Sequence, residues 1–246
     1  MQLRVALVVL ILQVKPLHKS TTKKILSLLK KYYPKPHCAL NFKNPLELLI
    51  ATILSAQCTD ERVNKVTEKL FKKYKNVNEY ANANLNEFEK DIYSTGFYRN
   101  KAKNIISACN LIKDKYKGKV PKDFDKLLEL PGVARKTANC VMGNAFNITS
   151  GVVVDTHVSR ISKKLDLTKN EDPNKIEQDL MKIIPKDEWI NFSHRLIWHG
   201  RKICDARKPK CEICFLNKLC PAAFKLILTL LIFPRLLLHD FHNLLY

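Results

Sequence analysis

Apolar residues recur at helical spacing along most of the chain, and turn signals separate the repeats. Ile25, Leu28, Leu29 and Tyr32 form one stripe with a period of about 3.6 residues, which predicts an amphipathic helix that Pro34 ends. No stretch alternates apolar and polar residues as a half-buried strand would, and no internal repeat is present. The pattern therefore predicts an all-α fold.

Capping signals mark the starts of the other predicted helices. Asn44-Pro45 followed by Glu47 is one such signal, because Asn caps the helix, Pro fits its first turn and Glu completes a capping box. The predicted helices cover residues 46–55, a segment opened by Thr59, residues 84–96, 100–116, 122–130 and 137–146, the segments opened by Asp155 and Asp172, and residues 189–203. Short helices with explicit caps are typical of a globular helical array.

The two ends of the chain are apolar and differ from the rest. Residues 6–12 and residues 226–233 are apolar runs, and neither reaches the roughly 18 residues that a membrane span needs. We expect residues 1–14 and 224–246 to be extensions outside the functional fold, without a membrane partner. A membrane-peripheral role is the alternative.

The net charge is +20, from 43 Lys and Arg against 23 Asp and Glu. Such an excess predicts attraction to a polyanion such as nucleic acid. Lysine far outnumbers arginine, however, as an AT-rich genome would also produce. The charge alone therefore does not decide whether the chain binds nucleic acid.

A turn between two predicted helices carries the first candidate chemistry. The segment LPGVARKTA at residues 130–138 combines a helix stop, a tight Pro-Gly turn and a new helix start. The first amides of a helix lack intrahelical partners, so the helix start predicts a site for a DNA phosphate. An ordinary helical hairpin is the other interpretation.

Lys136 lies in the first turn of the helix that follows this hairpin. A lysine ammonium is a poor nucleophile, but the helix terminus, Arg135 and burial against a base would each favour the neutral amine. Such an amine could attack a deoxyribose C1′, expel the base and leave a Schiff base. The alternative is a solvated surface charge.

Asp155 ends the apolar segment VVVD at residues 152–155. It is a typical helix cap, and an N-cap carboxylate still exposes one oxygen. We predict that it also faces Lys136, where it could accept the lysine proton and stabilise positive charge on the sugar.

The eight cysteines form two groups. Cys38, Cys58, Cys109 and Cys140 lie among apolar residues and are typical of small core side chains. Cys204-x6-Cys211-x2-Cys214-x5-Cys220 can bind zinc or a [4Fe-4S] cluster. Zinc sites usually pair two Cys-x-x-Cys knuckles and this run has one, which favours iron–sulfur. Arg207, Lys208 and Lys210 lie in the loop between the first two cysteines and suit phosphate contacts.

With these features the chain resembles the endonuclease III family, the helix-hairpin-helix, iron–sulfur DNA glycosylases with AP lyase activity. The resemblance covers about residues 20–223 and rests on LPGVARKTA at 130–138, VDTH at 154–157 and the cysteine spacing. It implies a bacterial-type base-excision-repair enzyme that removes oxidised pyrimidines and cuts the strand by β-elimination. It further implies a cytoplasmic, nucleoid-associated monomer acting on double-stranded DNA with a damaged base or abasic site.

The resemblance also assigns roles to single residues. Lys136 looks like the Schiff-base nucleophile, Asp155 like the activating carboxylate, and the four clustered cysteines like ligands of a structural [4Fe-4S] cluster. Gln57 resembles the family's glutamine that fills the gap left by a flipped base. Phe97 occupies the place of the family's apolar wedge, usually leucine, or else is a buried aromatic.

Other residues of the matched motifs are candidates for contacts with DNA. Gly132, Ala134 and Arg135 belong to the hairpin that would hold a phosphate. His157 either touches DNA near the lesion or completes a helix cap. Ala134 departs from the family pattern, which usually has a second glycine; its methyl group disfavours positive φ and is expected to weaken the approach of the phosphate slightly.

The resemblance implies two lobes and leaves two other functions to weigh. A six-helix barrel of residues 38–148 would carry the hairpin, and residues 15–37 with 149–223 would form the cluster domain. An adenine mismatch glycosylase is the first alternative, but that family lacks a lysine at the position of Lys136 and uses a glutamate in the early segment that here contains Gln57. A non-catalytic DNA-binding module is the second, and it would not need Lys136 and Asp155 together.

Overall fold

The computed structural model describes residues 19–223. Within this range it contains helices and no β-strand, so the all-α prediction is confirmed there. The apolar extensions predicted at residues 1–14 and 224–246 lie outside the described residues. Among the described helices, none combines the length and the apolar character needed to cross a membrane.

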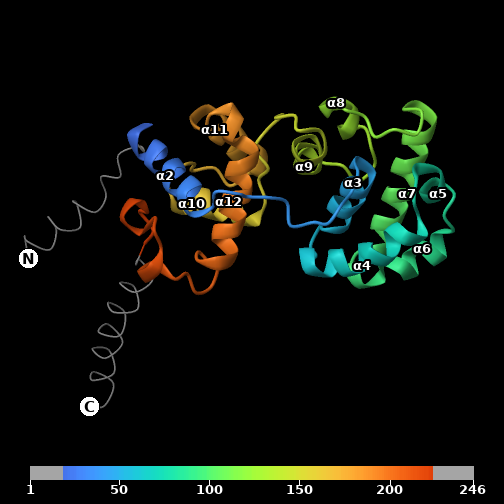
Figure 1. The fold of residues 1–246 in the computed structure, drawn as a ribbon, viewed down its shortest axis with the longest axis horizontal. Coiled ribbons are helices and arrows are strands. Elements are labelled where there is room, and N and C mark those ends of the chain that lie inside the picture. Colours follow the sequence, from blue (N-terminus) through green and yellow to red (C-terminus); the bar gives the residue numbers. More distant parts are fainter. Residues whose placement is uncertain (1–18, 224–246) are drawn as a thin grey trace, which may run out of the picture. The chain divides into compact units, whose positions relative to one another are not determined.

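The chain divides into two compact units (Figure 1). The cysteine unit takes its described residues from the stretch up to Pro34, from Thr156–Ile184 and from Arg195 onward. The hairpin unit consists of Lys35–Asp155 and Pro185–His194. Each unit is described by itself below.

The hairpin unit is built from short helices around an apolar core. Its helices are α3 (Pro45–Leu54), α4 (Asp60–Lys73), α5 (Val77–Ala81), α6 (Leu85–Ile92), η1 (Tyr93–Thr95), α7 (Tyr98–Lys115), α8 (Phe124–Leu128) and α9 (Arg135–Phe146). Helix α7 packs against α5 and α6, and α3 packs against α9 (Figure 1). Leu48, Phe88, Ile105 and Val141 are fully buried between these helices, so burial of apolar surface holds the hairpin in place.

The predicted caps set the helix boundaries, and one cap was missed. The side chain of Asn44 accepts a hydrogen bond from the amide of Glu47 at 3.0 Å, and the Glu47 carboxylate accepts one from the amide of Lys43 at 2.6 Å. The same arrangement recurs at Asn76 and Glu79, where it opens α5. The Asn-x-x-Glu signature was visible in the sequence, but the helix that follows is too short to show a periodic stripe.

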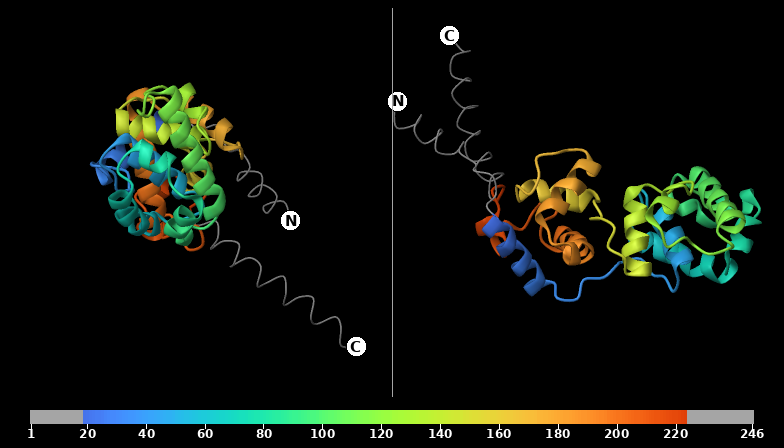
Figure 2. Two further views of the ribbon diagram at one scale, coloured as in Figure 1. Left: turned by 90° about the vertical axis from the view of Figure 1, so that its right-hand side faces the viewer. Right: turned by 90° about the horizontal axis from the view of Figure 1, so that it is seen from above.

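The cysteine unit contains the helices α2 (Lys19–Tyr32), α10 (Thr156–Lys164) and α11 (Pro173–Ile183), and the part of α12 (Trp189–Lys202) that begins at Arg195. It also contains the short η3 (Cys211–Ile213) and η4 (Asn217–Leu219). The short η2 (Lys186–Glu188) precedes α12. In both Figure 1 and Figure 2 the blue α2 lies beside the red segment that carries the clustered cysteines.

The predicted stripe of α2 is correct for its centre and wrong at its end. Ile25 and Leu29 are fully buried, but Tyr32 is 53% exposed and stacks on Phe215 with ring centroids 4.0 Å apart. Tyr33, one residue past the helix, is buried instead. The helical period no longer governs Tyr33, because the helix has already ended there.

Candidate functional site

The hairpin between α8 and α9 needs glycine at one position. Gly132 has φ +78°, a conformation that residues with a Cβ avoid. A Cβ at this position would also lie 2.9 Å from the Cβ of Asn104 on α7. Leu130 and Val133 on either side are buried and pin the turn to the core.

Ala134 fits the hairpin without strain, so the preference of alanine against positive φ does not apply at this position. It is the N-cap of α9 and has φ −93° and ψ 172°, which is ordinary extended backbone. Its methyl group is therefore accommodated, and it provides no side-chain hydrogen bond to the helix start. An N-cap without a side-chain acceptor leaves room for an external anion at the first amides of α9.

Arg135 and Lys136 occupy the first turn of α9. The guanidinium of Arg135 lies 5.0 Å from the centre of the Phe124 ring on α8, so it bridges the two arms of the hairpin. Lys136 is exposed, and its amine is accessible to a ligand.

A buried polar network underlies Lys136. A hydrogen bond with the Cys38 thiol lowers the pKa of the Cys140 thiol, and the thiol–hydroxyl contact with Thr52 and the positive charge of Lys136 lower it further. The sulfur of Cys140 lies 3.7 Å from the Thr52 hydroxyl. Asn144 Nδ2 also lies 3.7 Å from this sulfur.

The same network reaches towards Asp155. Asn144 Oδ1 lies 2.8 Å from His194 Nε2 on α12. Burial lowers the pKa of His194 to about 4, the neighbouring His37 lowers it too, and the charge of Asp155 opposes them. Lys136 and Asp155 both belong to the hairpin unit, and both act electrostatically on side chains that contact Asn144.

Cys140, Asn144 and His194 were not identified as site residues from the sequence. Cys140 and Cys38 were interpreted as core side chains, and Cys140 is indeed buried. The available signal was its position one helical turn after Lys136. Nothing local could have connected Asn144 with His194, because 50 residues separate them.

Gln57 and Phe97, the two residues predicted to enter the DNA duplex, both have positive φ angles. Gln57 has φ 53° and follows α3, whereas Phe97 has φ 48° and precedes α7. Gln57 is exposed, and Phe97 is 63% exposed. The alternative of a buried aromatic at Phe97 is therefore wrong.

His157 is half-buried within the cysteine unit. Its Nδ1 lies 3.4 Å from the guanidinium of Arg160, which also donates to the carbonyl of Cys204 at 2.7 Å. A Cβ at Gly200 of α12 would lie 2.5 Å from this imidazole, so only glycine permits the close approach. These contacts give His157 a packing role within its unit.

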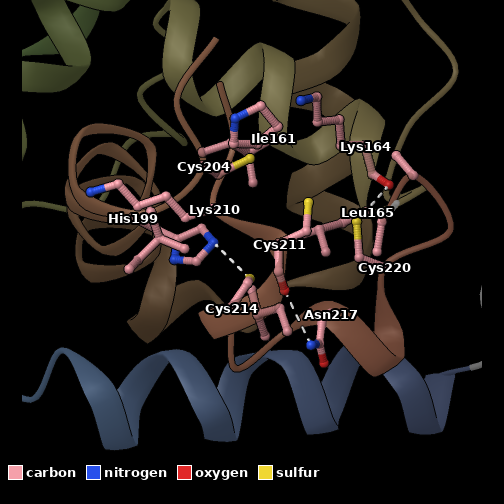
Figure 3. Close-up of a pocket in the computed structure, with 15 residues that line it drawn as sticks. Ile161, Lys164, Leu165, His199, Cys204, Lys210, Cys211, Cys214, Asn217 and Cys220 are labelled. Carbon is pink, nitrogen blue, oxygen red and sulfur yellow. Dashed lines mark hydrogen bonds between the residues drawn. The ribbon is translucent and has the colours of Figure 1, made fainter. Parts of the chain in front are cut away.

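The clustered cysteines lie around one pocket, into which Figure 3 shows their sulfur atoms converging. None of the four forms a disulfide. The remaining wall is largely apolar and includes Ile161, Leu165 and Leu216. Burial raises the pKa of the Cys214 thiol to about 11, so binding of a metal group there would release a proton.

The lining of this pocket suits an iron–sulfur cluster. Thiolates are the ligands of such clusters, and the four cysteines share the pocket with Lys164 and Lys210, whose charges would favour an anionic group.

His199 contacts this pocket from α12. Its Nε2 lies 3.5 Å from the sulfur of Cys214, and its Nδ1 lies 3.2 Å from the hydroxyl of Tyr33 (Figure 3 shows the first contact). Tyr33 thereby ties the residues after α2 to the cysteine loop. Sequence reasoning did not identify either residue.

The basic loop after Cys204 is ordered by an acidic side chain. Asp205 accepts hydrogen bonds from the amides of Arg207 at 2.8 Å and Lys208 at 3.1 Å, and these bonds lower its pKa. Arg207, Lys208 and Lys210 are all exposed. The loop can therefore present three cations to a polyanion.

Comparison with known proteins agrees with these features. Residues 50–186 match the HhH-GPD superfamily base excision DNA repair protein, and residues 204–220 match the iron–sulfur binding domain of endonuclease III. The endonuclease III of Synechocystis sp. is 56% identical over 205 residues, covering 83% of this chain and 94% of the relative. That of Bacillus subtilis is 47% identical over 189 residues, covering 76% and 86%.

A solved structure shows the same fold. The protein in the structure of a trapped endonuclease III–DNA covalent intermediate is 48% identical in sequence to this chain. The two chains superpose with a TM-score of 0.83, over 86% of this chain and 99% of the other. The hairpin, the cysteine pocket and these similarities lead to one conclusion: the chain belongs to the endonuclease III family of helix-hairpin-helix, iron–sulfur DNA repair enzymes.

Proposed function

We propose that Lys136 is the nucleophile with which this chain excises a damaged base from DNA and cuts the strand. The chain acts in base excision repair as a DNA glycosylase and AP lyase that removes oxidised pyrimidines, the activity of its family. The observation that carries the assignment is the exposed amine of Lys136 in the first turn of α9, directly after the hairpin. A covalent DNA adduct has been trapped on a 48% identical relative, which supports a covalent route here.

The reaction forms and breaks bonds in a fixed order. The neutral amine of Lys136 attacks C1′ of the damaged nucleotide, and the base departs with the glycosidic electron pair and takes up a proton. The C1′–O4′ bond of the sugar then breaks, O4′ receives the proton lost by the attacking nitrogen, and the open-chain sugar is left as an iminium on Lys136. This iminium acidifies the C2′ proton, whose loss expels the 3′ phosphate by β-elimination. Water then releases the lysine.

Asp155 is proposed as the carboxylate that accepts the ammonium proton and stabilises positive charge on the sugar. Its influence on His194 and the influence of Lys136 on Cys140 support a common electrostatic environment, because Asn144 contacts both of those residues. Cys140, Asn144 and His194 would then position the helix that carries Lys136.

DNA is bound through contacts that do not read sequence. The turn at Gly132 and Ala134 would hold a phosphate on the first amides of α9, with Arg135 beside it. Gln57 would fill the gap left by the extruded nucleotide, and Phe97 would wedge between bases, because both are exposed. The cations of the basic loop add affinity for the backbone.

The iron–sulfur domain supports DNA binding and does not supply the chemistry. Cys204, Cys211, Cys214 and Cys220 would hold a [4Fe-4S] cluster, which fixes both ends of the basic loop. Arg207 and Lys208 would then face DNA in a defined arrangement. His157, which is half-buried, would contact DNA near the lesion. We further infer a monomer that works in the bacterial cytoplasm on the nucleoid, consistent with its charge of +20 and its bacterial relatives.

Borohydride trapping tests the nucleophile directly. Incubation with a duplex that contains one abasic site should produce a covalent protein–DNA band, and Lys136→Ala should abolish it. Lys126→Ala is the matched control, because it removes an exposed lysine from α8, the other arm of the hairpin. A cross-link that survives in Lys136→Ala would assign the nucleophile to another residue.

A further inference from the structure

Gln57 and Phe97 have backbones that their side chains disfavour. Both occupy the left-handed region, at φ 53° and 48°, without the freedom of glycine. Such conformations persist only where the surrounding structure holds them.

Lys101 of α7 contacts both turns with one ammonium group. Its Nζ donates to the carbonyl of Leu54 at 2.8 Å and to the carbonyl of Thr95 at 2.8 Å. Leu54 is the last residue of α3, shortly before Gln57, and Thr95 is the last residue of η1, shortly before Phe97.

The backbone of Lys101 adds a third link to the same region. Its amide donates to the carbonyl of Phe97 at 3.1 Å, within the first turn of α7. Lys101 therefore bonds directly to Phe97 and, through Leu54, to the turn that carries Gln57. All these residues belong to the hairpin unit.

The environment of Lys101 is unusual for a lysine. The residue is only 5% exposed, and burial lowers the pKa of its amine. Its two acceptors are the terminal carbonyls of helices, which lack intrahelical donors and carry partial negative charge. An apolar side chain of similar length could fill the same space but would leave both carbonyls without this donor.

We propose that Lys101 is a positioning residue that fixes the turns of Gln57 and Phe97 relative to each other for insertion into damaged DNA. The proposal rests on the function proposed above, in which Gln57 fills the gap left by the extruded nucleotide and Phe97 wedges between bases. It predicts that loss of the ammonium impairs base release by way of Gln57 and Phe97, not by a general loss of structure.

The first test replaces Lys101 by methionine, which keeps the length of the stem and removes both hydrogen bonds. Single-turnover release of an oxidised pyrimidine, at saturating enzyme, should slow about tenfold or more, as expected for misplaced positioning groups. Affinity for undamaged duplex should stay within about twofold, because the hairpin and the basic loop are unchanged. Lys103→Met on the exposed face of α7 is the matched control and should release the base at the parent rate.

A double-mutant cycle separates positioning from a general structural role. In a Gln57→Ala/Phe97→Ala background, Lys101→Met should slow base release by less than about twofold further, because its effect has nothing left to act through. A full additional tenfold loss in that background would overturn the proposal. Should Lys101→Met fail to fold, Lys101→Gln, which keeps one donor, enters the same cycle with the same two outcomes.

Borohydride trapping of the unmutated protein separates failure of this proposal from failure of the proposed function. If the parent forms no borohydride adduct with abasic DNA, the proposed function falls. If the parent forms the adduct but the cycle is additive, only the role of Lys101 falls.

Discussion

Asn144 Oδ1 of α9 lies 2.8 Å from His194 Nε2 of α12, so the helix that carries Lys136 is joined to a buried imidazole. The pKa of His194 is lowered to about 4 by burial and by His37, against the opposing charge of Asp155. A neutral imidazole is therefore part of the native structure at neutral pH.

This histidine predicts a loss of stability in mild acid. His194 takes up a proton near pH 6.5 in the unfolded chain and only near pH 4 in the folded one, so the unfolded state binds more protons between these values. The free energy of unfolding therefore decreases as the pH is lowered from 6.5 to 4. At pH 5 the loss should approach about 2 kcal/mol. Urea unfolding at pH 7 and pH 5 would measure it.

The matched variant for this prediction is His194→Gln, which retains a donor for Asn144 but does not titrate. The decrease in the free energy of unfolding between pH 7 and pH 5 should be smaller in His194→Gln than in the parent, by about 2 kcal/mol. An equal drop in both proteins would show that other groups cause the acid sensitivity.

The hairpin predicts opposite outcomes at two neighbouring positions. Gly132→Ala should lower stability by about 1–3 kcal/mol, because the residue has φ +78° and its Cβ would press on Asn104. Displacement of the turn should also weaken DNA binding by about tenfold, equivalent to about 1.4 kcal/mol. Ala134→Gly should change either quantity little, since Ala134 has ordinary extended backbone. Fluorescence anisotropy with a labelled duplex and thermal unfolding are suitable measurements, and a large gain in affinity from Ala134→Gly would contradict this account.

Asp155→Asn should separate binding from turnover. The amide keeps the size of the side chain but cannot accept the lysine proton, so base release should slow by about 10²-fold or more. Affinity for a duplex with an uncleavable lesion should remain within about threefold of the parent. Turnover equal to that of the parent would leave Asp155 only a capping role.

The cysteine pocket predicts which thiols matter for the cluster. Cys211→Ala should lose the broad visible absorbance of the iron–sulfur group, together with most of the salt-sensitive DNA affinity that the basic loop supplies. Cys109→Ala, in the core of the hairpin unit, should keep that absorbance. Retention of the full absorbance by Cys211→Ala would remove Cys211 from the ligand set.

Much of the site could be predicted because its signals are local. The hairpin, the cysteine spacing and most helix caps each occupy a few consecutive residues whose conformation their own side chains determine. The φ of Ala134 could not be predicted, because it depends on how the turn packs between Leu130 and the start of α9, which a residue preference does not capture. The exposure of Phe97 likewise depends on how η1 and α7 meet.

The contacts missed from the sequence join residues far apart along the chain. Asn144 with His194, and Leu54 with Lys101, are separated by 50 and 47 residues. Neither pair belongs to a pattern with a period, so only the packing of helices brings them together. Nothing in the sequence distinguishes Lys101 from the exposed Lys103 of the same helix.

The division of the cysteine unit into three stretches has a consequence for biosynthesis. Residues of α2 leave the ribosome before the other described helices, yet Tyr33 pairs with His199, 166 residues later, and Arg195 donates to the Tyr33 carbonyl across 162 residues. Most of the hairpin unit is complete on the nascent chain before these partners exist. Helix α2 therefore remains without these partners until the residues from Arg195 to the cysteine loop have been synthesised.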